Sequence, residues 1–247
     1  MESRHPSYRA ILGWGEPLLL TLLVLSAACV DPRRYSNQGT EVLKTCGDEG
    51  LIDDGEDGNN QTKPAGDRGG YWYTFIDGKG TGSTVWPEPG TQGGAFAMSP
   101  GGVNGSKFAA NAKGRVGTGE VVFGALGLNF VDPEGLYDAS KYKGITFWAK
   151  KGPEGYNKVR FNVPDISTHN IGGVCSECFN YFGADLVLSE AWQQFVFTWH
   201  NLRQRPGWGS PRPNYIKPAK LFALQWQVSQ PGASFDIWID DVEFICD

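Results

Sequence analysis

The chain of 247 residues has little histidine, no long apolar run and no Lys/Arg cluster. Beyond the N-terminal segment only His169 and His200 remain, and neither stands in a Ser/His/Asp or Cys/His arrangement that would indicate nucleophilic catalysis. The apolar run Leu18–Ala28 is too short for a transmembrane helix, which needs about twenty residues. The formal net charge is −5, so the composition gives no electrostatic reason to expect nucleic-acid binding.

The N-terminal segment has the features of an export signal. Arg4 and Arg9 precede the apolar run and small residues follow it, an order typical of secretory signals; a buried N-terminal helix is the alternative. The end of the run, Leu25-Ser-Ala-Ala-Cys29, resembles the bacterial lipobox, in which cleavage leaves an acylated cysteine. We therefore predict a signal peptide over residues 1–28 and acylation of Cys29, which would anchor an exported protein to the cell envelope through lipid. Plain secretion is the alternative.

Residues 29–48 are polar and lack apolar periodicity, which predicts a flexible tether. Residues 49–247 contain no internal repeat and no second linker, so one domain is the simplest interpretation. In Val159-Arg160-Phe161-Asn162-Val163 and in Leu224-Gln225-Trp226-Gln227-Val228, apolar and polar residues alternate as in a half-buried strand.

Short apolar runs separated by Gly, Pro, Asn and Asp are found throughout this domain. No stretch carries a convincing helical stripe, although Ser140–Tyr142 and Lys217–Lys220 could each form one turn. Many short strands indicate an all-β sandwich or barrel. The predicted strands are Tyr71–Ile76, Ala95–Ser99, Lys107–Asn111, Glu120–Leu128, Ile145–Lys150, Lys158–Val163, Asp185–Leu188, Gln194–Trp199, Phe222–Val228 and Phe235–Phe244.

Four cysteines follow Cys29, and an even number in an exported chain favours disulfides. Cys175 and Cys178 are close enough in sequence to pair locally. Pairing of the other two, Cys46 and Cys246, would join the two ends of the domain. Four cysteines allow three connectivities, of which we predict this one. Zinc bound by His169 and the Cys175/Cys178 pair is the alternative, but no fourth ligand stands at a useful spacing.

Four segments resemble, in the same order, strands of galactose-binding-like jelly rolls. They are Leu51–Asp57, Tyr142–Lys150, Trp192–Thr198 and Phe235–Phe244. The groups that the chain resembles most are carbohydrate-binding modules of the family-eleven type and complex-I intermediate-associated-protein domains. The resemblance implies a jelly-roll β-sandwich of two antiparallel sheets that binds polysaccharide along one sheet face without catalysis, often with a structural calcium. The loop Pro164–Phe182, with its cysteine pair, departs from the cellulose-type modules, so the resemblance does not extend to a β-glucan ligand.

Sugar binding needs flat aromatic faces flanked by amide, carboxylate or guanidinium groups. The outward faces of three predicted strands carry such side chains. If these strands are neighbours in one sheet, the predicted ligand-binding surface consists of Trp148, Arg160, Asn162, Gln225 and Gln227, extended by Trp72 and Trp208 from within or beside loops. The alternative is that Trp148 packs under a loop and the amides only decorate a solvated face.

Acidic residues stand near both ends of the domain. Asp53-Asp54-Gly-Glu56 and Asp240-Asp241 would be adjacent if the first and last strands pair, and clustered oxygen ligands suit Ca²⁺. With the resemblance, this predicts a structural calcium held by Asp54, Glu56 and Asp241; two solvated acidic turns are the alternative. In the closing strand the aspartate pair interrupts the alternation, so a β-bulge there would return both apolar sets to the core.

Together these features predict a surface-anchored domain that binds polysaccharide or another glycan without cleaving it. One alternative is a structural or protein-interaction lipoprotein that uses the same sandwich. Another is a glycan-cleaving jelly-roll enzyme, which needs two carboxylates across a cleft. Asp165, Glu177 and Asp185 could in principle supply them.

Overall fold

Strands of this domain form where apolar and polar residues alternate in the sequence. The computed structural model describes residues 44–78, 80–90 and 96–246, which belong to one contact unit, Val42–Asp247. In β9 (Lys158–Val163) the side chains of Val159, Phe161 and Val163 are buried. The polar residues between them therefore point to the other face of the sheet.

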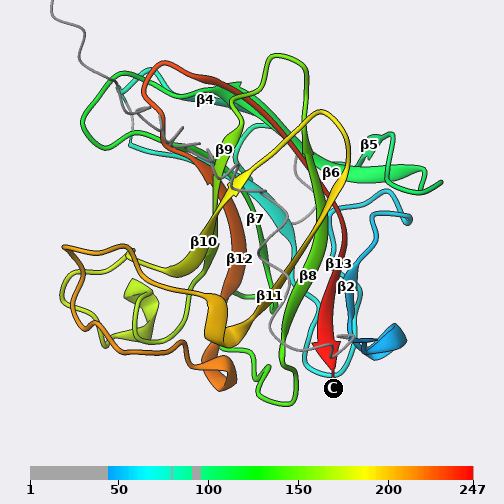
Figure 1. The fold of residues 1–247 in the computed structure, drawn as a ribbon, viewed down its shortest axis with the longest axis vertical. Coiled ribbons are helices and arrows are strands. Elements are labelled where there is room, and N and C mark those ends of the chain that lie inside the picture. The colour runs from blue at the N-terminus through cyan, green and yellow to red at the C-terminus, as the bar shows by residue number, and fades with distance from the viewer. Residues whose placement is uncertain (1–43, 79, 91–95, 247) are drawn as a thin grey trace, which may run out of the picture. The chain divides into compact units, whose positions relative to one another are not determined.

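Two antiparallel sheets pack face to face as a sandwich (Figure 1). The five-stranded sheet has the order β10-β9-β12-β7-β3, with β10 (Phe182–Val187), β12 (Ala223–Val228), β7 (Gly124–Asn129) and β3 (Trp72–Ile76) beside β9. The eight-stranded sheet has the order β11-β8-β13-β6-β4, formed by β11 (Gln193–Thr198), β8 (Gly144–Lys151), β13 (Ser234–Cys246), β6 (Phe108–Arg115) and β4 (Thr84–Trp86). The prediction of an all-β sandwich with two antiparallel sheets is confirmed.

Shorter elements complete the described residues. The strands β1 (Lys44–Thr45) and β2 (Leu51–Asp53) pair with β13, and β5 (Ser99–Pro100) pairs with β6. Of the two predicted helical turns, Lys217–Lys220 contains the 3₁₀ helix η4 (Pro218–Lys220), whereas Ser140–Tyr142 is a turn without a helix. The other 3₁₀ helices are η1 (Gly47–Glu49), η2 (Asn170–Gly172) and η3 (Trp199–Asn201). None of the helices in the described residues has the length and apolar character needed to cross a membrane.

Aromatic side chains from both sheets fill the space between them. The Phe147 ring of β8 lies 4.9 Å from that of Phe161 and 5.2 Å from that of Trp226, centroid to centroid. Trp72 of β3 stacks on Trp226 at 5.7 Å and is only 1% exposed. The prediction that Trp72 extends a ligand-binding surface is therefore wrong, because its ring is part of the core.

The two ends of the domain meet along β13. Lys44 pairs with Cys246, and Cys46 forms a disulfide with Cys246 that closes a sequence separation of 200 residues. The second disulfide joins Cys175 and Cys178, so the predicted connectivity is confirmed. The predicted tether extends too far, because Lys44–Asp48 already belong to the sandwich. The strand β1 has only two residues, which is too short for any alternation that would predict it.

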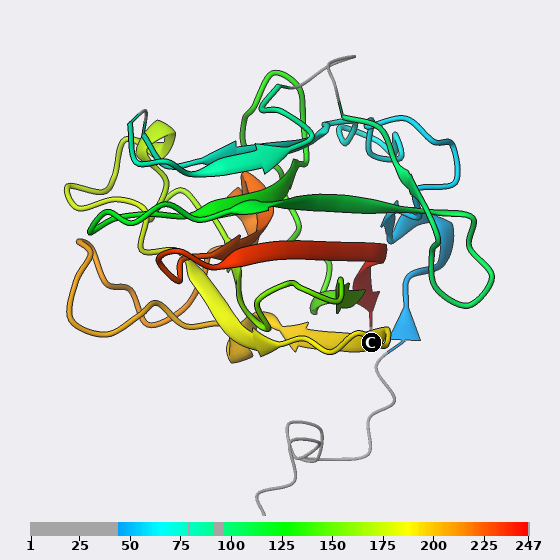
Figure 2. The same cartoon turned by 90° about the horizontal axis from the view of Figure 1, so that it is seen from above.

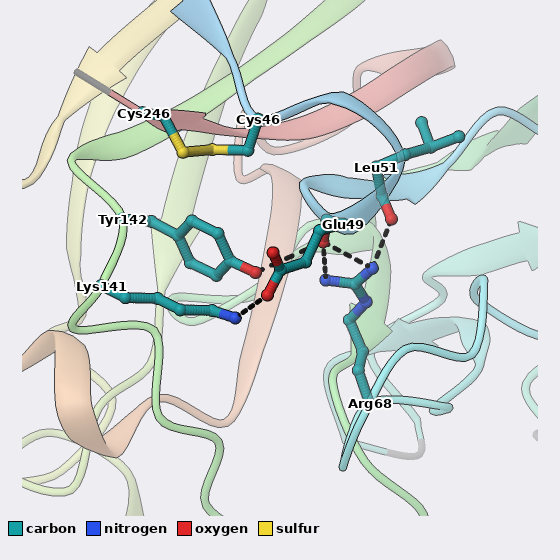
Figure 3. A network of polar contacts seen from close by, with 7 residues as sticks. All are labelled: Cys46, Glu49, Leu51, Arg68, Lys141, Tyr142 and Cys246. Atoms are coloured by element: carbon teal, nitrogen blue, oxygen red, sulfur yellow. Dashed lines mark hydrogen bonds and ion pairs between the residues drawn. A yellow bond between two sulfur atoms is a disulfide. The ribbon is translucent and has the colours of Figure 1, made fainter.

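A network of polar contacts fixes the chain next to the Cys46–Cys246 disulfide (Figure 3). The Arg68 guanidinium donates hydrogen bonds to the backbone carbonyls of Glu49 and Leu51. The Glu49 carboxylate accepts a hydrogen bond from Lys141, and this contact holds the pKa of Glu49 below its usual range. These contacts connect η1 and β2 to residues far away in the sequence.

The closing strand β13 contains the predicted bulge at its aspartate pair. Asp240 pairs with Trp148 and Glu243 with Thr146, so two residues of β13 face one residue of β8. Asp241 takes a positive φ of 45°, as the extra residue of a bulge can. Because of this bulge, Ile239 before it and Val242 after it are both fully buried.

The acidic residues predicted to bind calcium lie near this bulge. Glu56 Oε1 accepts hydrogen bonds from Ser106 Oγ at 2.9 Å and from the backbone of Lys107 at 2.7 Å. Burial raises the pKa of Asp241, and repulsion from Asp54 and Glu56 adds to this effect. In the part of the chain that the structure describes, no three His, Cys, Asp or Glu side chains gather closely enough to hold a metal ion. The calcium held by Asp54, Glu56 and Asp241 therefore stays a prediction from the resemblance.

Asp53 of β2 gives the domain an expected pH dependence. Its Oδ1 accepts a hydrogen bond from the Gly55 amide at 2.6 Å, whereas its buried Oδ2 has no hydrogen-bond partner among the described residues. Burial raises the pKa of Asp53 to about 7, so near neutral pH the folded protein holds a proton that the unfolded chain has released. The stability that this proton confers is complete below the unfolded pKa and is lost as the pH rises through about 7.

We therefore expect Asp53→Asn to gain stability relative to the wild type by roughly 2–3 kcal/mol between about pH 5 and about pH 8. The measurement is urea-induced unfolding of both proteins, followed by tryptophan fluorescence. Parallel pH profiles for the two proteins would contradict the assignment to Asp53.

The predicted signal peptide over residues 1–28 and the predicted acylation of Cys29 lie outside the described residues. Both stay predictions.

Candidate functional site

The outward face of the five-stranded sheet carries two adjacent rows of side chains. Each row crosses the sheet from β3 to β10, because paired residues on neighbouring antiparallel strands lie side by side. The first row is Tyr73, Gly127, Gln225, Asn162 and Gly183. The second row is Phe75, Ala125, Gln227, Arg160 and Asp185. In both rows the residue on β7 is small, Gly127 or Ala125, and it lies between larger side chains of β3 and β12.

Gly127 at the centre of the sheet allows the Tyr73 ring to lie across β7. A Cβ atom at this position would come within 2.8 Å of Tyr73 Cζ, so any other residue would push the ring away. The Tyr73 hydroxyl accepts a hydrogen bond from Gln225 Nε2 at 3.0 Å. Burial strongly raises the pKa of Tyr73, so its hydroxyl stays protonated and can donate a hydrogen bond.

Amide side chains form the rest of this polar floor. Asn162 Nδ2 donates to Gln227 Oε1 at 3.3 Å, and Gln227 Nε2 donates to Ser229 Oγ at 2.8 Å. Gln225 Oε1 is buried and has no hydrogen-bond partner among the described residues. A buried acceptor without a partner is energetically costly.

Two long loops wall one end of this face, the loop between β9 and β10 and the loop between η3 and β12. They project from the same end of the sandwich in Figures 1 and 2 (yellow-green and orange). Asn180 joins them, because its Nδ2 donates to the carbonyls of Arg205 at 2.9 Å and Trp208 at 2.6 Å and its Oδ1 accepts from the Arg205 amide. Gly209 has a φ of 90° and lies directly against Asn180. This contact fixes the backbone on both sides of Trp208.

Phe179 is held in an unusual conformation in the loop between β9 and β10. It follows the Cys175–Cys178 disulfide, and its φ is 76°, which is rare for a bulky residue. Its amide donates to the Thr168 carbonyl at 2.9 Å. Strained backbone of this kind is found preferentially at binding sites. Phe179 is 57% exposed, and Trp208 on the facing loop is 45% exposed.

Together these elements enclose a groove of about 730 Å³. Its floor comes from five residues of the outward rows, Phe75, Arg160, Asn162, Gln225 and Gln227, and its walls come from the two loops and from the segment before β7. The lining residues are Phe75, Val121, Phe123, Arg160, Asn162, Cys178, Phe179, Asn180, Tyr181, Arg205, Trp208, Gln225, Gln227 and Ser229.

Five of the seven predicted ligand-binding residues meet in this groove: Arg160, Asn162, Gln225, Gln227 and Trp208. The placement of Trp148 beside them is wrong. Trp148 lies on β8, which belongs to the other sheet between β11 and β13. Its side chain, which is half-buried, therefore faces away from the groove.

Four aromatic residues of the groove were not among the predicted ligand-binding residues: Phe75, Phe123, Phe179 and Tyr181. Phe179 and Tyr181 lie in a loop, where no periodicity marks direction. The cysteine pair immediately before Phe179 was the available signal, because such a bridge fixes the chain that follows it.

Two of the residues considered for zinc binding and for catalysis, His169 and Asp165, make structural contacts. The His169 ring stacks on Phe222 at 4.7 Å, and its Nδ1 accepts a hydrogen bond from the Ile171 amide at 3.2 Å. Asp165 is fully buried, and its carboxylate accepts hydrogen bonds from Thr168 Oγ1 at 2.8 Å and from the Lys217 amide at 3.0 Å. Asp165 is therefore unavailable as a general acid or base.

The fold matches that of a known carbohydrate-binding module. The family 11 module of a cellulosomal cellulase of Clostridium thermocellum superposes with a TM-score of 0.52 at 16% identity, covering 80% of this chain and 94% of that module. At this identity the match shows the jelly-roll fold alone. No family model matches the sequence.

One curated relative is similar in sequence. The chain is 27% identical over 222 residues to Endoglucanase 3 of Fibrobacter succinogenes (strain ATCC 19169 / S85). The match covers 88% of this chain but spans only 30% of that enzyme. The chain is therefore similar to a portion of a larger protein.

Proposed function

We propose that the chain binds polysaccharide without cleaving it, in the groove on the five-stranded sheet. The observation that carries the proposal is the combination within one groove of exposed rings, Phe179 and Trp208, with a floor of amides and a guanidinium. Rings of this kind stack on the C–H faces of sugars, and amides pair with sugar hydroxyls. The name of the module with the same fold supports the ligand class.

Several observations support the absence of catalysis. Asp165 is buried with its oxygens already hydrogen-bonded, and Asp185 forms ion pairs with Arg160 and Arg205. Within the described lining of the groove there is no carboxylate, whereas glycoside hydrolysis needs two. The similarity to part of an endoglucanase is consistent with a binding portion of a larger enzyme.

The test is a panel of soluble polysaccharides in affinity electrophoresis, with an assay for released reducing ends. We expect wild-type protein to be retarded by at least one polymer without cleaving it. The double variant Asn162→Ala with Gln227→Ala should bind at least about tenfold more weakly. Both amides are removed together because either one alone would lose its hydrogen-bond partner.

The matched control is Gln194→Ala, which removes an exposed amide from β11 in the other sheet and should bind like wild type. Failure to bind any polymer would favour a structural or protein-interaction role. Release of reducing ends would instead establish an enzyme.

A further inference from the structure

The charged side chains that line the described groove are both cationic. They are Arg160 and Arg205, and no acidic residue lines the groove with them. The protein as a whole has a formal net charge of −5. The groove therefore differs in sign from the average surface, and such local fields select ligands by charge.

One carboxylate is shared between these two arginines. Asp185 Oδ1 lies 2.7 Å from Arg205 Nη2 and 3.5 Å from Arg160 Nη1. Asp185 itself is mostly exposed to solvent. Two guanidinium groups share this one carboxylate, so the three side chains together carry one net positive formal charge.

Arg160 is held rigidly beside the amide floor. Its Nη2 donates to the Arg203 carbonyl at 2.6 Å, and its side chain is largely buried. Burial lowers the pKa of Arg160; attraction to Asp185 opposes this shift, and repulsion from Arg205 adds to it. A buried cation is costly unless an anion pairs with it, and a guanidinium offers a carboxylate two parallel hydrogen bonds.

We propose that the groove takes polysaccharide whose sugar residues carry an anionic group, which pairs with Arg160 and Arg205. This inference rests on the function proposed above and names its ligand class. Carboxylates of uronic acids and sulfate esters share the required charge. The neighbouring amides of Asn162 and Gln227 would then form hydrogen bonds with the hydroxyls of the same sugar.

The test compares polygalacturonate and alginate (carboxylates), carrageenan (sulfate esters) and mixed-linkage β-glucan (neutral) by isothermal titration calorimetry. We expect at least one anionic polymer to bind about tenfold or more tightly than the neutral one, with an affinity that falls between about 20 mM and about 300 mM salt. Comparison of the two carboxylate polymers with carrageenan shows whether the groove binds carboxylates or sulfate esters.

Arg205→Gln is the informative variant, because this half-exposed side chain can change without disturbing the core. It should weaken binding of the anionic polymer about fivefold or more. The control Arg115→Gln makes the same charge change on an exposed residue of β6 in the other sheet and should leave the affinity unchanged. Equal or tighter binding of the neutral polymer would overturn the anion inference while the proposed function stands; binding of no polymer at all would overturn both.

Discussion

Replacing Cys46 and Cys246 together by serine is expected to lower the free energy of unfolding by about 5 kcal/mol. The bridge closes a sequence separation of 200 residues, so its loss restores a large conformational freedom to the unfolded chain. In the folded state η1 and β2 would keep their contacts through Arg68 and Glu49 (Figure 3). Urea-induced unfolding of the wild type and the double variant measures the difference.

The matched control is the double variant Cys175→Ser with Cys178→Ser. That bridge closes only three positions of sequence, so the same entropy argument gives about 2 kcal/mol. The two disulfides should therefore differ clearly in their effect on unfolding. Equal losses in both variants would show that loop entropy is not what makes the Cys46–Cys246 bridge stabilising.

Trp208→Ala is expected to weaken polysaccharide binding about 10- to 100-fold. The ring is 45% exposed on a loop that Asn180 fixes to its neighbour, so it offers a preorganised face on which a sugar can stack. The change removes little core packing, and stability should stay within about 0.5 kcal/mol. Titration calorimetry with the best polymer of the panel measures the affinity, and urea unfolding measures the stability.

Trp86→Ala is the control for this prediction. Trp86 is 55% exposed and lies at the end of β4 in the other sheet, so its removal deletes a similar ring from a different face. It should bind polysaccharide like the wild type. An equal loss of affinity in the two variants would contradict a site in the groove.

The alternation of apolar and polar residues identifies which side chains point outward, but it does not show which sheet they belong to. Alternation in β9 and β12 correctly separates Arg160 and Gln227 from the core, because a strand has a side-chain period of two. The same rule places Trp148 on the outward face of β8, but it says nothing about which strands are neighbours. That depends on long-range pairing, here of β8 with β11 and β13.

The strand β3 shows a second limit of the alternation rule. In Trp72-Tyr73-Thr74-Phe75-Ile76 both faces carry large apolar or aromatic residues, so the pattern does not tell which face is buried. The structure buries Trp72 against Trp226 and turns Tyr73 outward over Gly127. Only packing decides between the two.

The end of β13 was more predictable, because two independent features of the sequence agreed there. The break in alternation at Asp240 and Asp241 required a bulge, and the bulge is present. The cysteines at positions 46 and 246 bracketed the domain, and they are joined. The position of Phe179, in contrast, depends on a loop conformation with a positive φ. No local sequence pattern predicts this conformation.

We propose that glycan binds on the outward face of the five-stranded sheet. The most direct test is a ¹H–¹⁵N spectrum recorded while the best-binding oligosaccharide is titrated in. The side-chain amides of Asn162, Gln225 and Gln227 and the indole N–H of Trp208 should shift together, while the indole N–H of Trp148 on the other sheet stays in place. Shifts at Trp148 with no change at the three amides would contradict the claim.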